Sequence, residues 1–191
     1  MRDVLLETDR LCLRRFTEDD LDALAALDGD PEVMRYITGG IPRTRSEIAE
    51  RILPAYIAYH DESPEFGFFV AEERSTGRFL GWFHFRPYKG NETEIELGYR
   101  LIRDVWGQGL ATEGSRALIL RGFTTLDVPR VVATAFKANA ASQRVMEKVG
   151  LRYEEDFLYP EKYLPGWSED ARRGVKYGVD REAWLAAESA G

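Results

Sequence analysis

Residues 94–113 read EIELGYRLIRDVWGQGLATE, and they are the most informative segment of the chain. Polar and apolar residues alternate over its first half, which predicts a strand with Glu94 and Glu96 on one face. A turn containing Gly107 and Gly109 follows, and a helix is expected from Leu110. Such a turn presents backbone N–H groups at the positive end of a helix, where a phosphate or pyrophosphate binds well. Glycine has no Cβ and lets the backbone approach a ligand, although these two glycines alone also fit an ordinary turn.

Two common phosphate-binding motifs do not fit the stretch. A Walker loop requires Lys followed by Ser or Thr after its second glycine, and Gly114 is followed by Ser115 and Arg116. A dinucleotide-binding fingerprint requires a third glycine where Thr112 stands, and it belongs to a parallel βαβ unit. Here the turn is preceded by what we expect to be an antiparallel meander.

The rest of the chain predicts one mixed α/β domain over residues 1–191. Thr17 and Thr44 are expected to cap helices, and Pro54 is expected to kink or end the second of them. Alternation and β-branched residues predict strands, and apolar spacing predicts helices. The expected strands are 11–16, 66–71, 79–85, 93–102, 130–136, 151–159 and 175–179; the later helices are 110–123, 139–149 and 181–188.

The composition excludes several classes of protein. Among 191 residues, 26 Lys and Arg stand against 33 Asp and Glu, a net charge of −7, whereas a general nucleic-acid binder needs a basic face. The single Cys12 forms no intrachain disulfide, and with His60 and His84 it does not supply a common closed zinc site. The charged N-terminus is unlike a signal peptide, and no run reaches membrane-spanning length. We expect a cytoplasmic enzyme or binding domain without nucleic-acid or membrane partners.

The glycine turn resembles the acyl-CoA pyrophosphate loop of the GNAT superfamily of N-acyltransferases, written [QR]-x-x-G-x-[GA]. Gly109 and Ala111 occupy the last two fixed positions, and Trp106 stands where the pattern has Gln or Arg. Three blocks, 6–14, 96–113 and 139–151, also resemble the branch of the ribosomal-protein acetyltransferases RimJ and RimL. Together they extend over most of the chain from Leu6 to about Tyr159.

The resemblance implies a fold and a cofactor. The fold is a single GNAT domain of mixed α+β type, with a mostly antiparallel sheet splayed at the acetyl-CoA groove and flanked by helices. The cofactor is acetyl-CoA as acyl donor, with no metal. Asn139 would cap a helix and contact the pantetheine arm. The other implied cofactor-binding residues are Ser142, Leu101 and Ile102 for the pantetheine, and Trp106, Gly107, Gln108, Gly109, Leu110, Ala111 and Thr112 around the pyrophosphate.

The resemblance also suggests catalytic residues. Many GNAT enzymes protonate the leaving thiolate with a Tyr seven residues after the Asn, but Met146 occupies that position and is more simply a core residue. In the RimL-like branch a Ser replaces it, which here is Ser142; a serine in the first helical turn bonded to the backbone is the alternative. For the base, Glu96 matches the acid that the family carries on this strand. Glu94, Asp104, Glu113 and water are alternatives.

These features predict an N-acetyltransferase that transfers an acetyl group to a primary amine by direct attack in a ternary complex. The amine belongs to a protein N-terminus or to a small molecule, and residues 30–60 and 159–173 are expected to contact it. The alternatives are a non-catalytic acyl-CoA-binding module and an antibiotic- or polyamine-modifying acetyltransferase. A homodimer is one open alternative for the oligomeric state.

Overall fold

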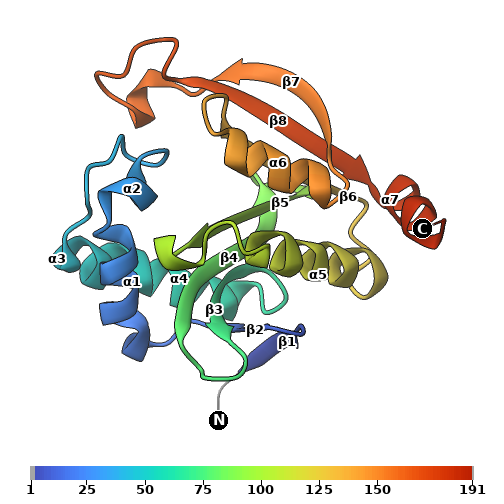
Figure 1. The fold of residues 1–191 in the computed structure, drawn as a ribbon, viewed down its shortest axis with the longest axis horizontal. Helices are drawn as coiled ribbons and strands as arrows, with labels where there is room; N and C mark the ends of the chain where they lie inside the picture. The colour runs from blue at the N-terminus through green and yellow to red at the C-terminus, as the bar shows by residue number, and fades with distance from the viewer. Residues whose placement is uncertain (1–2, 191) are drawn as a thin grey trace. The chain divides into compact units, whose positions relative to one another are not determined.

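The computed structural model describes residues 3–190. Its eight strands form one mixed sheet in the order β1-β2-β3-β4-β5-β6-β8-β7, shown in Figure 1. The chain divides into two compact units, Met1–Arg86 with Gly98–Ala117 and Pro87–Leu97 with Leu118–Gly191. Strand β5 (Asn91–Leu101) and helix α5 (Leu110–Thr124) contribute residues to both units.

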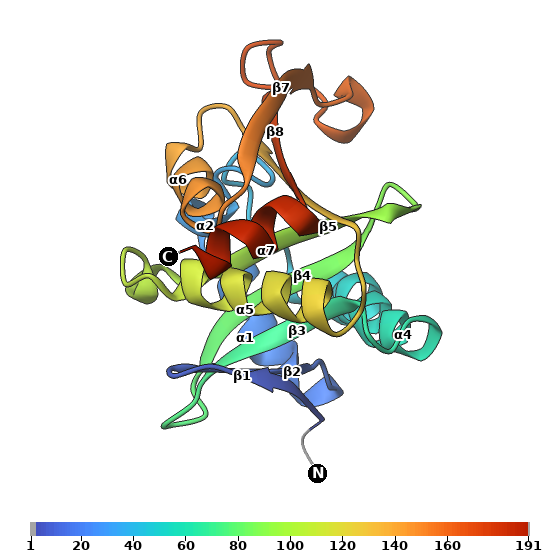
Figure 2. The same cartoon turned by 90° about the vertical axis from the view of Figure 1, so that its right-hand side faces the viewer.

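The first unit contains the antiparallel strands β1 (Val4–Glu7), β2 (Leu11–Arg15), β3 (Gly67–Glu73) and most of β4 (Phe79–Tyr88). Leu13 pairs with Ala71, and Phe69 pairs with Phe83. These strands match the predicted ones, except that β1 was not expected. It pairs with β2 through a tight hairpin in which the Thr8 N–H donates to the Leu11 carbonyl at 2.9 Å, and Figure 2 shows the two strands beside each other.

The helices of this unit precede β3 and pack on its core. They are a 3₁₀ turn (Glu18–Asp20), α1 (Leu21–Asp28), α2 (Pro31–Met34), α3 (Arg45–Glu47), a π-helical segment (Ile48–Ile52) and α4 (Leu53–Glu62). Both predicted caps are confirmed: the Thr17 N–H donates to Asp20 and the Thr44 N–H to Glu47, each at 2.8 Å. The apolar stripes of these helices bury Leu24, Leu27, Ile48 and Leu53 against β-strand residues such as Val70 and Trp82.

Pro54 was expected to kink or end its helix, and it does not end it. Helical residues run from Arg45 to Glu62, and Pro54 lies in the first turn of α4, directly after the π-helical segment. Proline lacks an N–H and is tolerated in a first turn, where that group has no helical acceptor. The π-helical segment has already interrupted the α-helical hydrogen bonds, so the helix continues through Pro54.

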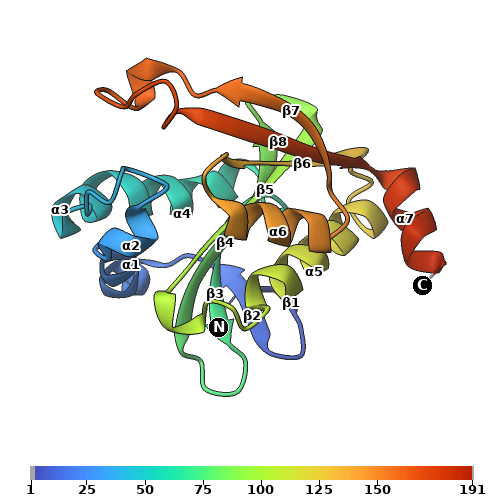
Figure 3. The same cartoon turned by 45° about the horizontal axis from the view of Figure 1, so that its top comes forward.

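The second unit continues the sheet with both parallel and antiparallel pairs. Strand β6 (Arg130–Phe136) is parallel to β5, with Ile95 opposite Val131. Strand β8 (Arg173–Asp180) is antiparallel to β6 and to β7 (Arg152–Leu158). Helix α6 (Ala140–Lys148) lies beneath β6 and β8 in Figure 3. Helix α7 (Arg181–Ser189) packs Trp184 against Phe123, with ring centroids 5.6 Å apart.

Candidate active site

The glycine turn lies in the first unit and has the expected backbone geometry. After β5 the chain forms a 3₁₀ turn (Arg103–Val105), and α5 starts at Leu110. Gly107 and Gly109 have φ values of 76° and 82°, a region that residues with a Cβ rarely adopt. The Glu113 N–H donates to the Gly109 carbonyl at 2.9 Å, so the first helical hydrogen bond begins there. The N–H groups of the three preceding residues, 110–112, have no acceptor within the helix and suit an anion.

Glu113 joins this turn to the β1–β2 hairpin. Its carboxylate accepts hydrogen bonds from the Thr8 hydroxyl at 2.6 Å, the Arg10 N–H at 2.9 Å and the Arg10 Nε at 2.7 Å. The same guanidinium donates to the Gln108 carbonyl at 2.9 Å. Burial opposes the ionisation of Glu113, but the hydrogen bonds from Thr8 and Arg10 outweigh it and lower its pKa. Thr8 and Arg10 therefore hold the turn in place, a function that the sequence analysis missed.

Trp106, which departs from the family pattern, closes the end of β5. Its indole Nε1 donates to the Leu101 carbonyl at 2.8 Å, while the Ile102 N–H donates to the Leu80 carbonyl at 2.9 Å. The backbone groups implied for the pantetheine thus already take part in contacts within the first unit. A carbonyl oxygen has two lone pairs, so Leu101 keeps the capacity to accept a second hydrogen bond.

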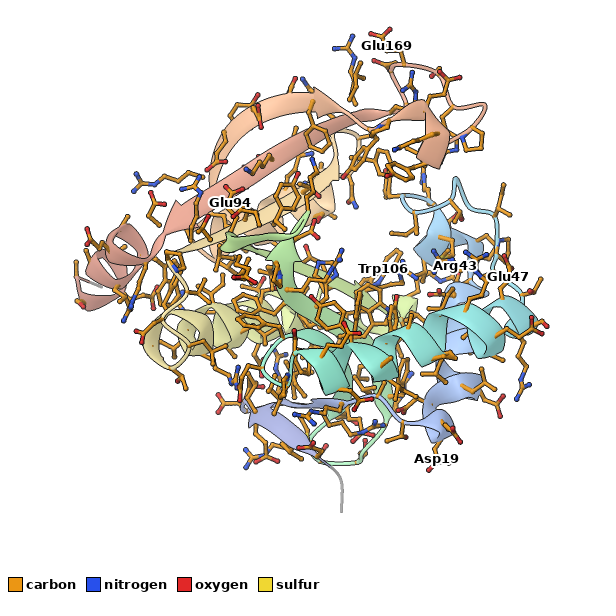
Figure 4. All side chains as sticks on the ribbon, turned by 180° about the vertical axis from the view of Figure 1, so that it is seen from behind. Asp19, Arg43, Glu47, Glu94, Trp106 and Glu169 are labelled. Carbon is orange, nitrogen blue, oxygen red and sulfur yellow. The ribbon has the colours of Figure 1, made fainter. Side chains whose placement is uncertain are left out.

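Glu94, Asp104 and Glu113, which were considered as the base, form ion pairs. In the second unit Glu94 lies 3.2 Å from the Arg130 Nε and 3.0 Å from the Lys176 Nζ, and Figure 4 shows it against β8. In the first unit the exposed Asp104 lies 3.0 Å from the Arg78 guanidinium. Glu113 pairs with Arg10, as described above. Each of these three acids therefore already holds a cationic side chain.

Glu96 contacts a hydroxyl group. It is half-buried on β5 between the buried Ile95 and Leu97, which confirms the alternation that places it on the same face as Glu94. The Thr134 hydroxyl of β6 donates to a Glu96 carboxylate oxygen at 3.3 Å. Both residues belong to the second unit.

Tyr159 is a further residue of this cluster that sequence reasoning missed. Burial raises the pKa of Tyr159 to about 12, against the effect of the Thr134 side chain, which lowers it. Its ring packs on Phe136 and Phe157 with centroid distances of 4.5 and 4.8 Å. Thr134 is a polar residue within the otherwise apolar strand VVATAF, and that interruption was the available sequence signal.

Asn139 and Ser142 lie together at the start of α6. The Asn139 side-chain oxygen accepts from the Ser142 N–H at 3.2 Å, so the expected N-cap is confirmed. Ser142 is half-buried. Met146, one turn later, has 3% of its surface exposed and belongs to the core, as the sequence indicated.

Within 3–190, no three His, Cys, Asp or Glu side chains come together in a way that would hold a metal ion. In the same part of the chain, no helix has both the length and the apolar character needed to cross a membrane.

Comparison with known proteins identifies the family. The acetyltransferase (GNAT) domain family matches residues 10–152. The FsC-acetyl coenzyme A-N(2)-transacetylase of Aspergillus fumigatus is 31% identical over 187 residues, which cover 94% of this chain and 77% of that protein. A GNAT-family acetyltransferase from Bacillus anthracis has a crystal structure with a TM-score of 0.74 at 26% identity, covering 93% of this chain and 98% of its own.

A further structure shows the same fold at lower identity. It is RimL, a ribosomal L7/L12 alpha-N-protein acetyltransferase in complex with coenzyme A, with a TM-score of 0.78 at 19% identity over 95% of this chain and 99% of its own. The family match extends over both units and includes the glycine turn and Glu96. The chain therefore belongs to the GNAT family and is an acetyl-CoA-dependent N-acetyltransferase.

Proposed function

We propose that the protein transfers the acetyl group of acetyl-CoA directly to a primary amine, with Glu96 as the general base. The observation that carries the assignment of the base is the position of Glu96. It is half-buried on β5 between Ile95 and Leu97, and its carboxylate accepts a hydrogen bond from the Thr134 hydroxyl. A carboxylate placed in this way can accept a proton from the amine during its attack.

The turn in the first unit binds the pyrophosphate of the cofactor in this proposal. Backbone N–H groups from Gly107 to Thr112 supply the hydrogen bonds, and the positive φ values of Gly107 and Gly109 support the assignment. The hydrogen bonds from Arg10 to Glu113 and Gln108 keep the turn in one conformation before the cofactor arrives. A preformed site loses less conformational entropy on binding.

The second unit supplies the proton transfers. A lysine amine titrates near ~10.4 and an α-amine near ~8, so the amine must lose a proton to attack. The nitrogen forms a bond with the acetyl carbon, the carbon–sulfur bond breaks, and Glu96 takes the proton from nitrogen. Ser142 donates a hydrogen bond to the leaving thiolate, supported by its half-buried position in the first turn of α6.

The proposal covers two classes of acceptor. The transacetylase of Aspergillus fumigatus, which is similar to 94% of this chain, is named for transfer to an N(2) position. The RimL structure is described as an alpha-N-protein acetyltransferase. We therefore propose either a small-molecule amine or a protein N-terminus, bound by residues 30–60 and 159–173. A screen that measures thiol release with N-terminal peptides, polyamines and aminoglycosides separates the two.

The base is tested with Glu96→Gln, and Glu94→Gln serves as its neighbour on the same face. We expect Glu96→Gln to lower kcat/KM most at neutral and low pH, on the scale of ~10²–10⁴-fold for lost general-base catalysis. The defect shrinks at high pH because the amine is then already neutral. Equal profiles for wild type and Glu96→Gln contradict the assignment, and thiol release no faster than background with every acceptor contradicts the proposed transfer.

A further inference from the structure

Two arginines of the first unit share one buried carboxylate. Asp28, the last residue of α1, is fully buried, and its two oxygens contact the Arg100 guanidinium of β5 and the Arg43 Nη1, the latter at 3.1 Å. The Arg43 N–H also donates to the Asp28 carbonyl at 3.0 Å, which ties the loop before α3 to α1 (Figure 4). Two guanidinium groups against one carboxylate leave a surplus of one positive charge.

Aromatic rings of the same unit hold Arg100 and a third arginine. The Arg100 guanidinium lies 4.9 Å from the centre of the Trp82 ring, and the Arg86 guanidinium lies 5.4 Å from the centre of the Phe68 ring. These two rings meet edge to face with centroids 5.7 Å apart. A cation is attracted to the face of an aromatic ring, so both guanidinium groups are held close to each other.

The charges around Tyr56 show the same surplus. Its ring stacks on Phe68 with centroids 3.9 Å apart. One negative and three positive side chains act electrostatically on its phenol, namely Asp28, Arg43, Arg86 and Arg100. Glu47 also acts on Arg43, but its carboxylate is exposed and accepts from the Thr44 N–H at 2.8 Å. We call Asp28, Arg43, Arg86, Arg100 and Trp82 the arginine cluster.

The arginine cluster also has a surplus of hydrogen-bond donors. Within residues 3–190, the Trp82 Nε1 and the Arg100 Nε are buried and have no hydrogen-bond partner, whereas buried polar groups of native proteins nearly always have one. Arg43 contacts Asp28 through one nitrogen atom, and a guanidinium has five N–H donors. Solvent reaches Arg43, because 28% of its side chain is exposed. A further carboxylate would supply both negative charge and acceptors.

The arginine cluster adjoins the backbone proposed to hold the pantetheine. Arg100 directly precedes Leu101 and Ile102, and Ile102 packs against the apolar core of the first unit. Arg103, the next residue, lies 3.6 Å from Asp30, which follows the end of α1. The pantetheine arm ends in the acetyl thioester, so groups beside it are placed to contact the acceptor.

We propose that the arginine cluster binds a carboxylate of the acceptor, so that the preferred substrates are amines that also carry a negative charge. Arg43 donates to the carboxylate, and the charges of Arg100 and Arg86 add to the attraction. The inference rests on the proposed acetyl transfer and narrows its acceptors. The surplus positive charge repels polycations such as polyamines and aminoglycosides. The carboxylate belongs either to a peptide near its N-terminus or to a small molecule.

The test compares kcat/KM between acceptors that differ in this carboxylate. Peptides that begin Ser-Asp-Ala and Ser-Ala-Asp are measured against Ser-Asn-Ala and Ser-Ala-Asn, and γ-aminobutyrate is measured against γ-aminobutyramide as the small molecule. We expect the acid to be favoured about 10–100-fold in at least one pair, because a hydrogen bond between charged groups is strong. The net charge of −7 of the whole chain would favour the opposite order. Ratios near one in all three pairs overturn the inference, as does spermidine exceeding every acid.

Arg43→Gln tests whether the preference comes from the arginine cluster. We expect the ratio of acid to amide to fall by about tenfold, and Arg43→Lys to give an intermediate ratio because it keeps the charge without the guanidinium fork. Arg181→Gln is the matched control: Arg181 pairs with Asp127 at 2.7 Å in the second unit and is 36% exposed, so the same charge is removed elsewhere. It should keep the wild-type ratio. An unchanged ratio in Arg43→Gln, or an equal fall in Arg181→Gln, overturns the inference.

The outcomes separate this inference from the proposed transfer. Thiol release no faster than background with every acceptor contradicts the transfer itself. Transfer that proceeds equally well to the acid and the amide of each pair contradicts only the carboxylate site. The wild-type ratios alone decide between these cases, whatever the stability of the variants.

Discussion

Ser142 is proposed to donate a hydrogen bond to the leaving thiolate, so pH should affect its variant differently from Glu96→Gln. We expect Ser142→Ala to lower kcat/KM less than Glu96→Gln does at neutral pH, because a thiolate with a thiol pKa near ~8.5 is a fair leaving group. Its defect should persist at high pH, since it does not depend on the protonation of the amine. The measurement is kcat/KM against pH for both variants. A Ser142→Ala enzyme that only binds CoA more weakly would make Ser142 a cofactor contact.

His84 should make the folded protein sensitive to acid. Its ring packs near Phe68 and Trp82, and burial together with Arg86 and Arg100 lowers the pKa of His84 to about 3. An unfolded histidine binds a proton near ~6.5. The unfolded state therefore takes up more protons between pH 6.5 and about 3, and stability is lost as the pH falls through that window.

The variant His84→Gln isolates this contribution. Going from pH 7 to pH 4.5, we expect the free energy of unfolding of wild type to fall by roughly 1–3 kcal/mol more than that of His84→Gln. Urea unfolding at each pH measures both. The comparison uses the pH dependence, so a constant loss from the smaller side chain cancels. If the free energy of unfolding falls equally with pH in wild type and His84→Gln, His84 does not contribute to the acid sensitivity.

At the scale of elements, one buried ion cluster joins β2, the 3₁₀ turn and β3. The Arg14 guanidinium bonds both oxygens of Asp20 at 2.8 and 2.6 Å and a Glu72 oxygen at 2.9 and 2.7 Å. All three side chains are less than 10% exposed. Hydrogen bonds to Asp20, and then to Glu72, raise the pKa of Arg14 against the effect of burial.

Removing Arg14 should therefore destabilise the protein strongly. Arg14→Met leaves two buried carboxylates without their cation, which costs about 3–5 kcal/mol. Arg45→Met is the control, because Arg45 pairs with Asp22 at an exposed site and such a pair contributes about 0–1 kcal/mol. Urea unfolding of both variants checks the difference. If the two variants lose similar free energies of unfolding, the buried cluster stabilises the protein no more than an exposed ion pair does.

The turn between β5 and α5 yields a prediction about cofactor affinity. Gly109→Val places a β-branched residue at a φ of 82° beside the N–H groups proposed to hold the pyrophosphate. We expect CoA to bind at least about tenfold more weakly, because backbone strain of ~1–3 kcal/mol distorts the turn. Gly166→Val is the matched control: its φ is also 82° and a Cβ there meets nothing within 4 Å. Unchanged CoA affinity in Gly109→Val, measured by calorimetry, would exclude the turn as the binding element.

At the scale of the whole molecule, CoA should stabilise the folded chain. A ligand that binds only the folded state at 100 times its Kd adds about 2.7 kcal/mol. For a chain of this length each kcal/mol raises Tm by ~2–4 °C, which predicts a shift of about 5–10 °C. NAD and ATP contain a similar adenosine and phosphates but no pantetheine, so they are the controls. A larger shift with either one than with CoA would contradict the assigned cofactor.

Much of the fold follows from local patterns. The capping boxes at Thr17 and Thr44 and the N-cap at Asn139 involve residues three positions apart, and each forms as expected. The alternation around Glu96 correctly placed it on one face of β5. Strand β1 was missed because it was assigned no alternating pattern, and it exists through its pairing with β2. Pro54 does not end its helix, because it lies in the first turn of α4, directly after the π-helical segment.

The candidate site also combines features that short sequence motifs indicate with contacts that form only in the folded chain. Motifs along the chain were enough to indicate the family, the glycine turn and the set of four acids, because each motif depends on residues that are close in sequence. The partners of these acids come from the tertiary structure, because they lie far along the chain: Glu113 bonds Thr8 across 105 residues, Glu94 bonds Lys176 across 82, and Thr134 bonds Glu96 across 38. A carboxylate's chemistry depends on the charges and hydroxyls within a few ångströms, and strand pairing brings those groups together.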